Sequence, residues 1–93
     1  MSYLVTFDEA VDKDLEDMPP DVRVRLFARA DILTNNPRPG ASRELTGKLR
    51  GYRRLRLGDY RVVYSIDEAV KEVTVWAIGH RRDVYEQFMR RGT

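Results

Sequence analysis

The chain has 93 residues, of which 42% are hydrophobic and 34% charged, with a formal net charge of +2 at pH 7. It contains no cysteine and one histidine, which excludes disulfides, zinc–thiolate sites, cysteine nucleophiles and multi-histidine metal sites, so we expect neither metal nor cofactor. A chain of this length supports one hydrophobic core, and the sequence therefore predicts a single domain over residues 1–93.

The two ends of the chain differ strongly in charge. Residues 1–36 hold 4 basic and 8 acidic side chains, a net of −4, whereas residues 37–93 hold 13 basic and 7 acidic ones, a net of +6. Such asymmetry indicates a face that binds a polyanion, although charge alone does not choose among nucleic acid, an acidic protein and a membrane surface. The opening residues MSYLVTFDEA lack the basic and apolar regions of a signal peptide, and we expect a soluble cytoplasmic protein that does not bind membranes.

The amino-terminal third predicts a strand followed by two helices. Residues 3–7 are β-branched and aromatic and predict a first strand, after which Asp8 is suited to cap a helix. That helix has an apolar stripe at Val11, Leu15 and Met18 and ends at the two prolines. A second helix starts at Pro20 or Asp21 and ends at TNNPRPG, with an apolar stripe at Val22, Leu26, Ala30 and Leu33. The acids of both helices are interpreted as solvated.

Residues 52–57 and 60–66 are rich in β-formers and are separated only by Gly58 and Asp59. This pattern predicts a tight hairpin in which Gly58 takes a positive φ. The predicted register places Leu57 opposite Tyr60, Arg56 opposite Arg61, Leu55 opposite Val62 and Arg54 opposite Val63. Because side chains alternate along a strand, one face would carry the core residues Leu55, Leu57, Tyr60, Val62 and Tyr64. The other face would carry Arg54, Arg56 and Arg61 beside Val63.

Like charges directly opposite each other across a sheet cost up to roughly 1 kcal/mol. The arginines therefore either splay apart on a solvated face or meet an anion, and the pattern alone leaves both open.

Residues 37–50 have no clear local structure, residues 71–80 predict a central strand, and residues 81–91 predict a short helix. The predicted fold is α+β, with two amino-terminal helices on one face of a small, mainly antiparallel sheet of about four strands and a short carboxy-terminal helix.

The stretch LTGKLRGYRRLRLGDYRVVYSID, followed by VWAIGHRRDVY, resembles the RelE/ParE superfamily of bacterial toxins, and more closely the RelE-type messenger-RNA interferases. The resemblance covers nearly the whole chain and is most specific where RLRLGDYRVVY is joined to GHRRDVY. It implies a RelE-like toxin of a type II toxin–antitoxin module, held in check by a cognate antitoxin in a hetero-oligomer. It further implies a metal-independent endoribonuclease that cuts mRNA in the ribosomal A site by attack of a 2′-OH on the adjacent phosphodiester.

The resemblance also implies roles for individual residues. Arg61 matches the sheet arginine that contacts the scissile phosphate, Arg81 matches a second arginine after the last strand, and Tyr85 matches a tyrosine that stacks on a base. Arg54 and Arg56 match paired basic residues on the strand before the turn.

Further candidates follow from their position or charge. His80 is a candidate general base or acid, or a hydrogen-bond donor to phosphate. Strand alternation separates it from Arg81 unless the last strand ends by Gly79. Glu44 is a weaker catalytic candidate, since Arg43 aligns better at that position. Lys48 and Arg82 are predicted to bind RNA, and the tail arginines Arg90 and Arg91 to attract it.

Two other functions remain open. A ParE-like protein shares the fold but poisons DNA gyrase by protein binding and cleaves no RNA. A relative that binds RNA or its antitoxin without cutting would keep the same charged residues. The combination of Arg61, Arg81 and Tyr85 favours the nuclease.

Overall fold

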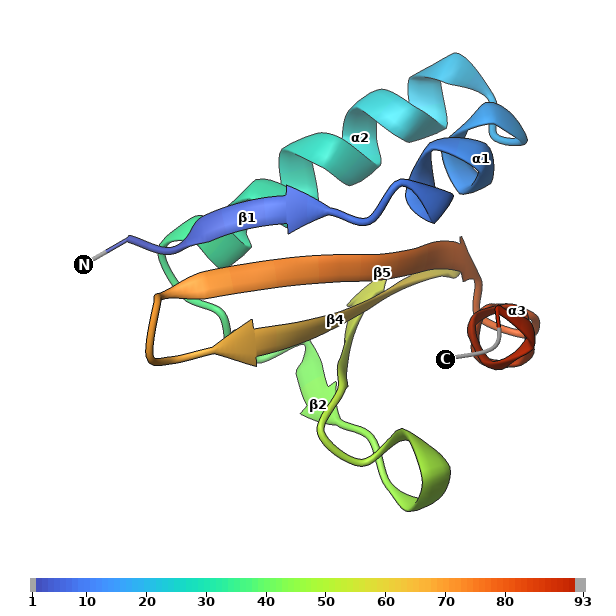
Figure 1. Ribbon diagram of the computed structural model, residues 1–93. Coiled ribbons are helices and arrows are strands. Elements are labelled where there is room, and N and C mark those ends of the chain that lie inside the picture. The colour runs from blue at the N-terminus through green and yellow to red at the C-terminus, as the bar shows by residue number, and fades with distance from the viewer. Residues whose placement is uncertain (1, 92–93) are drawn as a thin grey trace.

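The computed structural model describes residues 2–91, so the first residue and the last two residues of the predicted domain lie outside it. Its main elements are, in chain order, β1 (Leu4–Phe7), α1 (Ala10–Glu16), α2 (Pro20–Ala30), β2 (Ser42–Glu44), β3 (Arg53–Leu57), β4 (Tyr60–Asp67), β5 (Glu72–His80) and α3 (Val84–Arg90). The strands form one sheet in the order β1-β5-β4-β3-β2 (Figure 1). β1 is parallel to β5, and the other neighbours are antiparallel.

The predicted α+β class is confirmed, with one correction to the sheet. It has five strands where about four were expected, because the unassigned segment 37–50 contains β2. β2 is only three residues long and pairs with β3 in the register that places Ser42 opposite Leu55. None of the helices that the structure describes is long and apolar enough to cross a membrane.

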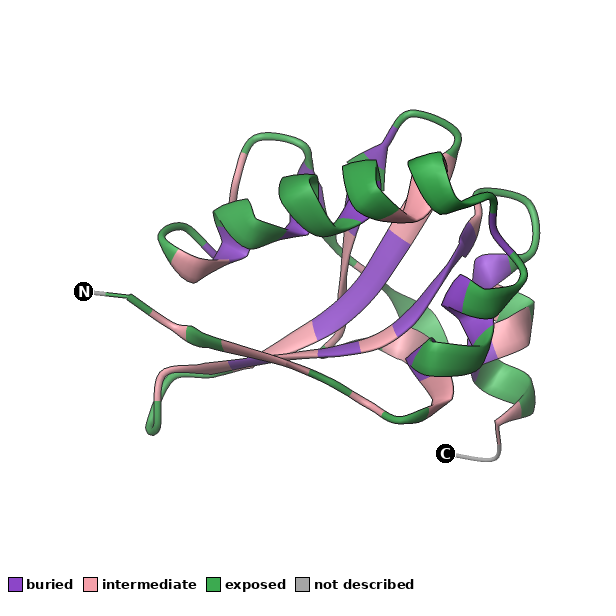
Figure 2. Ribbon diagram, turned by 90° about the horizontal axis from the view of Figure 1, so that it is seen from above, coloured by how far each residue is buried: buried purple, intermediate pink, exposed green. Residues whose placement is uncertain are grey.

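The two sheet faces are covered differently. α1 and α2 lie over one face, and α3 lies beside the carboxy-terminal end of the strand β5 (Figure 1). Between the sheet and the first two helices lies the larger core cluster, which includes Val11, Leu26, Leu33, Leu55, Val62 and Tyr64. A smaller cluster of Val63, Ala77, Val84 and Phe88 seats α3. Figure 2 shows the buried residues along the central strands and on the inner sides of the helices.

The helix limits follow local chemistry. Pro20 occupies the first turn of α2, where its fixed φ suits a helix start and its missing N–H costs nothing. Asp8 was expected to be the N-cap of α1, but Glu9 occupies that place without a side-chain cap. Asp8 instead accepts a hydrogen bond from the backbone N–H of Ala10 at 3.2 Å. The second helix continues as a short 3-10 helix, Asp31–Thr34, which buries Leu33.

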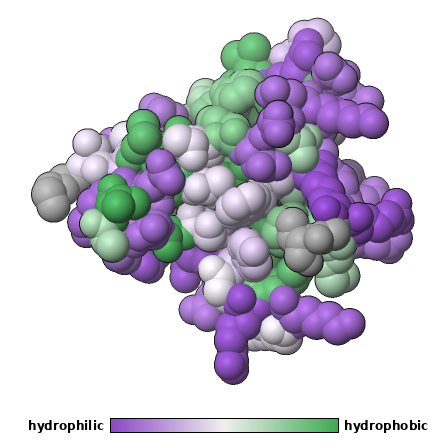
Figure 3. All heavy atoms as spheres, viewed as in Figure 1, coloured by the Kyte–Doolittle hydropathy of each residue, from purple (hydrophilic) through white to green (hydrophobic). Residues whose placement is uncertain are grey.

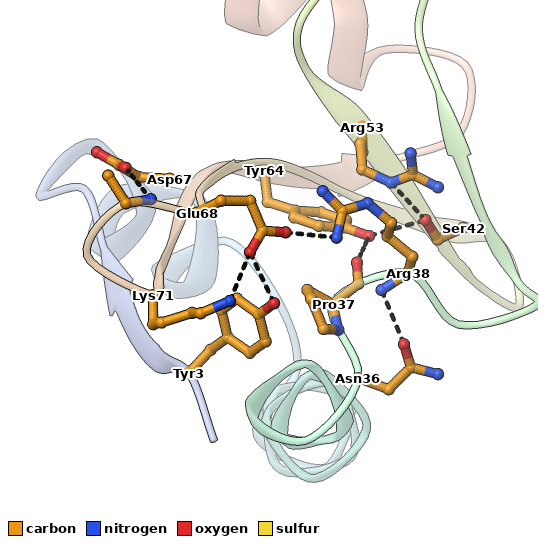
Figure 4. Close-up of polar contacts among 11 residues, drawn as sticks. Tyr3, Asn36, Pro37, Arg38, Ser42, Arg53, Tyr64, Asp67, Glu68 and Lys71 are labelled. Carbon is orange, nitrogen blue, oxygen red and sulfur yellow. Dashed lines mark hydrogen bonds and ion pairs between the residues drawn. The ribbon is translucent and has the colours of Figure 1, made fainter. Parts of the chain in front are cut away.

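Three polar side chains attach the loop before β2 to the sheet (Figure 4). The hydroxyl of fully buried Tyr64 lies 2.6 Å from the carbonyl oxygen of Pro37 and 2.8 Å from the hydroxyl oxygen of Ser42. Arg53 Nε donates to the same Ser42 oxygen at 2.9 Å. These bonds hold β2 along β3, although the three residues of β2 have no apolar alternation that would predict a strand.

Candidate functional site

The predicted hairpin register is confirmed at every position. Leu57 lies opposite Tyr60 and Arg56 opposite Arg61, and Gly58 takes a φ of 63° in the turn between them. A positive φ is readily adopted by glycine, and the two-residue turn fixes which residues face each other. The alternation therefore places Arg54, Arg56 and Arg61 on the face opposite the larger core.

The segment after β5 completes an open concavity on this face. It is lined by six residues from four parts of the chain, Arg54, Arg56, Arg61, Arg81, Arg82 and Tyr85. The backbone N–H of Arg81 donates to the carbonyl of Asp59 at 2.8 Å, which fixes the segment against the β3–β4 turn. Val84 is fully buried, so the next residue, Tyr85, stands at the rim. Figure 3 shows hydrophilic side chains projecting where the end of β5 and α3 lie in Figure 1.

Arg61 is the most constrained arginine of the concavity. Its Nη1 donates to the carbonyls of Gly58 at 2.8 Å and Tyr60 at 2.9 Å, which holds the guanidinium against the turn. Partial burial lowers the pKa of Arg61, and the positive charges of Arg54, Arg56 and Arg81 lower it further, while Tyr85 acts in the opposite direction. The site thus disfavours positive charge in the absence of an anion.

Nothing in residues 2–91 neutralises this charge. The ion pairs of the described chain involve Arg38, Lys71, Arg90 and Arg91, and none includes an arginine of the concavity. Five guanidinium groups with no carboxylate partner are suited to hold an anion, since guanidinium donates paired hydrogen bonds to carboxylate and phosphate oxygens. Of the two interpretations left open by the sequence, this geometry favours the anion site.

Two predicted residues lie outside the concavity. β5 continues through His80, which pairs with Tyr60, and the two rings lie 6.1 Å apart on the face of the larger core. His80 Nδ1 accepts a hydrogen bond from the backbone N–H of Arg82 at 3.3 Å. Lys48 lies in the 3-10 helix Gly47–Leu49 and lines a separate groove with Tyr52 and Phe88.

One expectation from the sequence was wrong. Asp14 was interpreted as a solvated acid, but it is only 7% exposed. Arg91 was expected to attract RNA, yet it forms an ion pair with Asp14. The available signal was spacing, because Asp14 falls three residues after Val11 on the apolar stripe of α1. Glu44 ends β2 opposite Arg53 and does not line the concavity. No group of three or more potential metal ligands occurs in residues 2–91.

Known proteins are similar to this chain in sequence and in fold. Residues 5–85 match the family model described as ParE toxin of the type II toxin-antitoxin system, parDE. Toxin RelG of Mycobacterium tuberculosis is 32% identical over 89 residues, which cover 94% of this chain and 100% of RelG. The chain belongs to the RelE/ParE toxin superfamily.

Solved structures of the superfamily confirm the RelE-like fold. The RelBE2 toxin–antitoxin complex of M. tuberculosis contains a chain that matches with a TM-score of 0.80 and 28% identity, covering 87% of this chain and 100% of that one. A double mutant of E. coli toxin RelE in the free state matches with a TM-score of 0.76 and 26% identity over 100% of both chains.

Proposed function

We propose that this protein is the toxin of a type II toxin–antitoxin module and a ribosome-dependent endoribonuclease that cleaves mRNA in the A site. One observation carries the proposal. Arg61 of β4, Arg81 after β5 and Tyr85 of α3 line one concavity together with Arg54 and Arg56 of β3. These are the residue types that the RelE resemblance requires, and they come from separate parts of the chain.

The proposed reaction is an internal transesterification. The ribose 2′-oxygen forms a bond to phosphorus, the bond from phosphorus to the 5′-oxygen breaks, the 2′-OH loses a proton and the departing 5′-oxygen gains one. The pentacovalent phosphorane carries additional negative charge. Arg61, already held by the turn carbonyls, would donate to it without reorganisation, and a donor of that kind contributes roughly 10²–10³-fold in rate. Arg81 would bind a second phosphate oxygen.

Proton transfer has fewer candidates in this chain. Guanidinium groups do not lose their protons in proteins, and His80 lies on the other sheet face. Tyr85 carries the only hydroxyl among the residues that line the concavity, and we assign it base stacking at the rim. The chain therefore supplies mainly charge stabilisation. A dependence on the ribosome follows, since alignment of the 2′-OH and part of the proton transfer must come from outside the chain.

The antitoxin is proposed as the cytoplasmic protein partner. Large apolar side chains are exposed on β1, on α2 and on the 3-10 helix that follows, with Leu4 63%, Val24 69% and Phe27 45% accessible. Figure 3 shows this hydrophobic surface where α2 and β1 lie in Figure 1. Exposed patches of this kind mark protein-binding surfaces. The RelBE2 relative was solved as a toxin–antitoxin complex, and we propose the same hetero-oligomeric arrangement here.

The alternative is a ParE-like protein that inhibits gyrase by binding it. The family model over residues 5–85, which describes ParE toxins, favours this alternative. A member that binds RNA or antitoxin without cutting would have the same concavity. The two alternatives differ from the proposal in the absence of RNA cleavage.

The test is toeprinting of a translating message with purified protein, comparing the wild type with Arg61→Ala. Arg29→Ala is the matched control, because Arg29 is exposed on α2 and lies outside the concavity. Cuts at A-site codons that persist in the control and vanish in Arg61→Ala are expected. If the wild-type protein arrests growth but makes no cut, the nuclease proposal is wrong, and a gyrase supercoiling assay on the same sample then tests the ParE alternative.

A further inference from the structure

The carboxylate of Asp14 joins α1 to β5 and to α3, whose contacting residues lie 64 and 73 positions later in the chain. Oδ2 accepts a hydrogen bond from the backbone N–H of Ile78 in β5 at 3.1 Å. Oδ1 accepts hydrogen bonds from the Gln87 side-chain amide of α3 and from Arg91 Nη2 just after that helix. A carboxylate that is 7% exposed thus connects α1 on one sheet face to α3 on the other.

These contacts complete an edge of the sheet that β1 leaves open. β1 ends at Phe7, opposite Val75, while β5 continues to residue 80. Beyond the end of β1, the N–H of Ile78 donates to Asp14, and the carbonyl of Trp76 accepts from Arg91 Nη1 at 2.8 Å. Buried backbone groups without partners cost about 1–3 kcal/mol each. The side chains of Asp14 and Arg91 therefore take the place of a neighbouring strand, and these hydrogen bonds fix where the two side chains lie.

α3 depends on such contacts because it has only seven residues. An isolated helix of that length is unstable in water, so tertiary contacts hold it. Val84 and Phe88 supply the apolar part. The helix also approaches β5 closely: a Cβ placed on Gly79 would lie 2.9 Å from Gln87 Oε1 and 3.4 Å from Val84 Cβ. Gln87 therefore has little freedom to leave the Asp14 carboxylate.

We propose that Asp14 is a positioning residue that holds Tyr85 at the rim of the concavity. Tyr85 lies two residues before Gln87 in α3, so the place of its ring follows the place of the helix. Gln87 and Arg91 fix the two later positions of this segment against the same buried carboxylate. This inference rests on the proposed function for its effect on cleavage, but the docking of α3 can be measured without any activity.

The first measurement is the fluorescence of Trp76, the single tryptophan of the chain. Its ring packs against the cluster that seats α3, 6.4 Å from the ring of Tyr52, and its carbonyl binds Arg91. The variant is Asp14→Asn, which keeps an acceptor for Ile78 and removes the charge that pairs with Arg91. We expect red-shifted emission and stronger acrylamide quenching, with unchanged far-UV circular dichroism. Glu16→Gln, an exposed carboxylate of the same helix, is the control and should change neither.

The second measurement is a double-mutant cycle on A-site cleavage. We expect Asp14→Asn to slow cleavage about 10-fold in the wild-type background, since small misplacements of a site residue reduce rates strongly. In a Tyr85→Ala background the same substitution should have no further effect. Equal losses in the two backgrounds would overturn the positioning role, and so would unchanged Trp76 emission and quenching in Asp14→Asn.

Misfolding of Asp14→Asn and a lack of RNA cleavage by the wild-type protein can each be told apart from failure of the positioning role. If Asp14→Asn does not fold, Gln87→Met removes one donor to Asp14 while keeping the side-chain length, and it should shift Trp76 emission in the same direction; an unchanged spectrum then overturns the inference. If the wild-type protein cuts no RNA, the proposed function fails. The fluorescence of Asp14→Asn then still decides whether Asp14 holds α3.

Discussion

The two faces of the β3–β4 hairpin have opposite properties, although they come from the same residues in alternation. On the face toward α1 and α2, Leu55, Val62 and Tyr64 are 0% exposed. On the other face, Arg54 and Arg61 are half-buried and Arg56 is exposed, with no carboxylate among the residues that line the concavity. The first face forms the core that stabilises the fold. The second face holds arginines that form no ion pair with the described residues.

The second face is itself divided. At the end nearer α3, Val63 and Ala77 form an apolar seat for Val84 and Phe88. The arginines occupy the remainder, so the short helix leaves the concavity open and carries Tyr85 to its rim. The residues that stabilise the fold and the residues proposed to bind RNA thus alternate along the same strands. Substitutions on neighbouring positions should therefore affect different measurements.

The largest expected effect on stability is on the core face. Leu55→Ala removes a fully buried side chain, and such changes cost about 2–5 kcal/mol in the free energy of unfolding. Urea denaturation followed by circular dichroism should show a lower midpoint with an unchanged slope. Arg56→Ala, one residue away, should not lower the midpoint, because it removes an exposed side chain and one of two like charges that lie opposite each other. Comparable losses in the two variants would contradict the separation of the faces.

The largest expected effect on function is at Arg61. Loss of one preorganised donor to the developing charge costs roughly 10²–10³-fold in rate, so Arg61→Ala should reduce A-site cleavage by that factor. Its two bonds to the turn carbonyls are worth about 1 kcal/mol each in stability, which urea denaturation measures separately. Arg61→Lys keeps the charge but loses the paired donors, so its cleavage rate should fall between the rates of the wild type and of Arg61→Ala. A lysine variant as slow as Arg61→Ala would show that geometry alone decides.

A substitution at Arg56 is expected to raise the free energy of unfolding, by less than Leu55→Ala lowers it. It lies directly opposite Arg61, so Arg56→Gln should relieve repulsion and raise the free energy of unfolding by up to roughly 1 kcal/mol. The same variant should bind single-stranded RNA more weakly. In a plot of log K against log salt concentration, the slope should decrease by about 0.7 for one lost phosphate contact. Arg29→Gln on α2 is the matched control, and an equal change of slope there would refute a localised RNA site.

Local geometry explains what the sequence could predict. A two-residue turn with glycine at its first position determines pairing, and alternation then assigns the faces, so the hairpin register was correct in full. The six residues of the concavity were also chosen in advance by resemblance and charge, and their roles stay predictions.

The misses share a different cause, which is distance along the chain. β2 is held by Ser42 through Tyr64, 22 residues later. Asp14 lies on the apolar stripe of α1, but its partner Arg91 comes from 77 residues away. Neither partner can be inferred from a window around the residue itself. His80 could share a face with Arg81 only if the last strand ended before residue 80. β5 instead continues through residue 80, so the His80 ring lies beside the ring of Tyr60.

The smallest predicted effect lies far from both faces, in the surface cluster around Glu68. Its carboxylate accepts hydrogen bonds from Arg38 at 2.6 Å, Lys71 at 3.0 Å and Tyr3 at 2.9 Å (Figure 4). These partners lower the pKa of Glu68 to about 2, from an ordinary value of 4.5, with the Arg38 bond as the main cause. A carboxyl group whose pKa is lower in the folded state stabilises the fold above its unfolded pKa.

The contribution of Glu68 is therefore complete above pH 4.5 and is lost as the pH falls toward 2. Glu68→Gln should lower the melting temperature slightly at pH 7, and the difference from wild type should disappear near pH 2. Because these side chains are exposed to solvent, 0.5 M salt should shrink the pH 7 difference by about half or more through screening. Glu16→Gln, which removes one exposed carboxylate outside the described ion pairs, is the matched control. A difference that persists unchanged at pH 2 would mean that the glutamine alters packing in the turn, since the charge no longer contributes there.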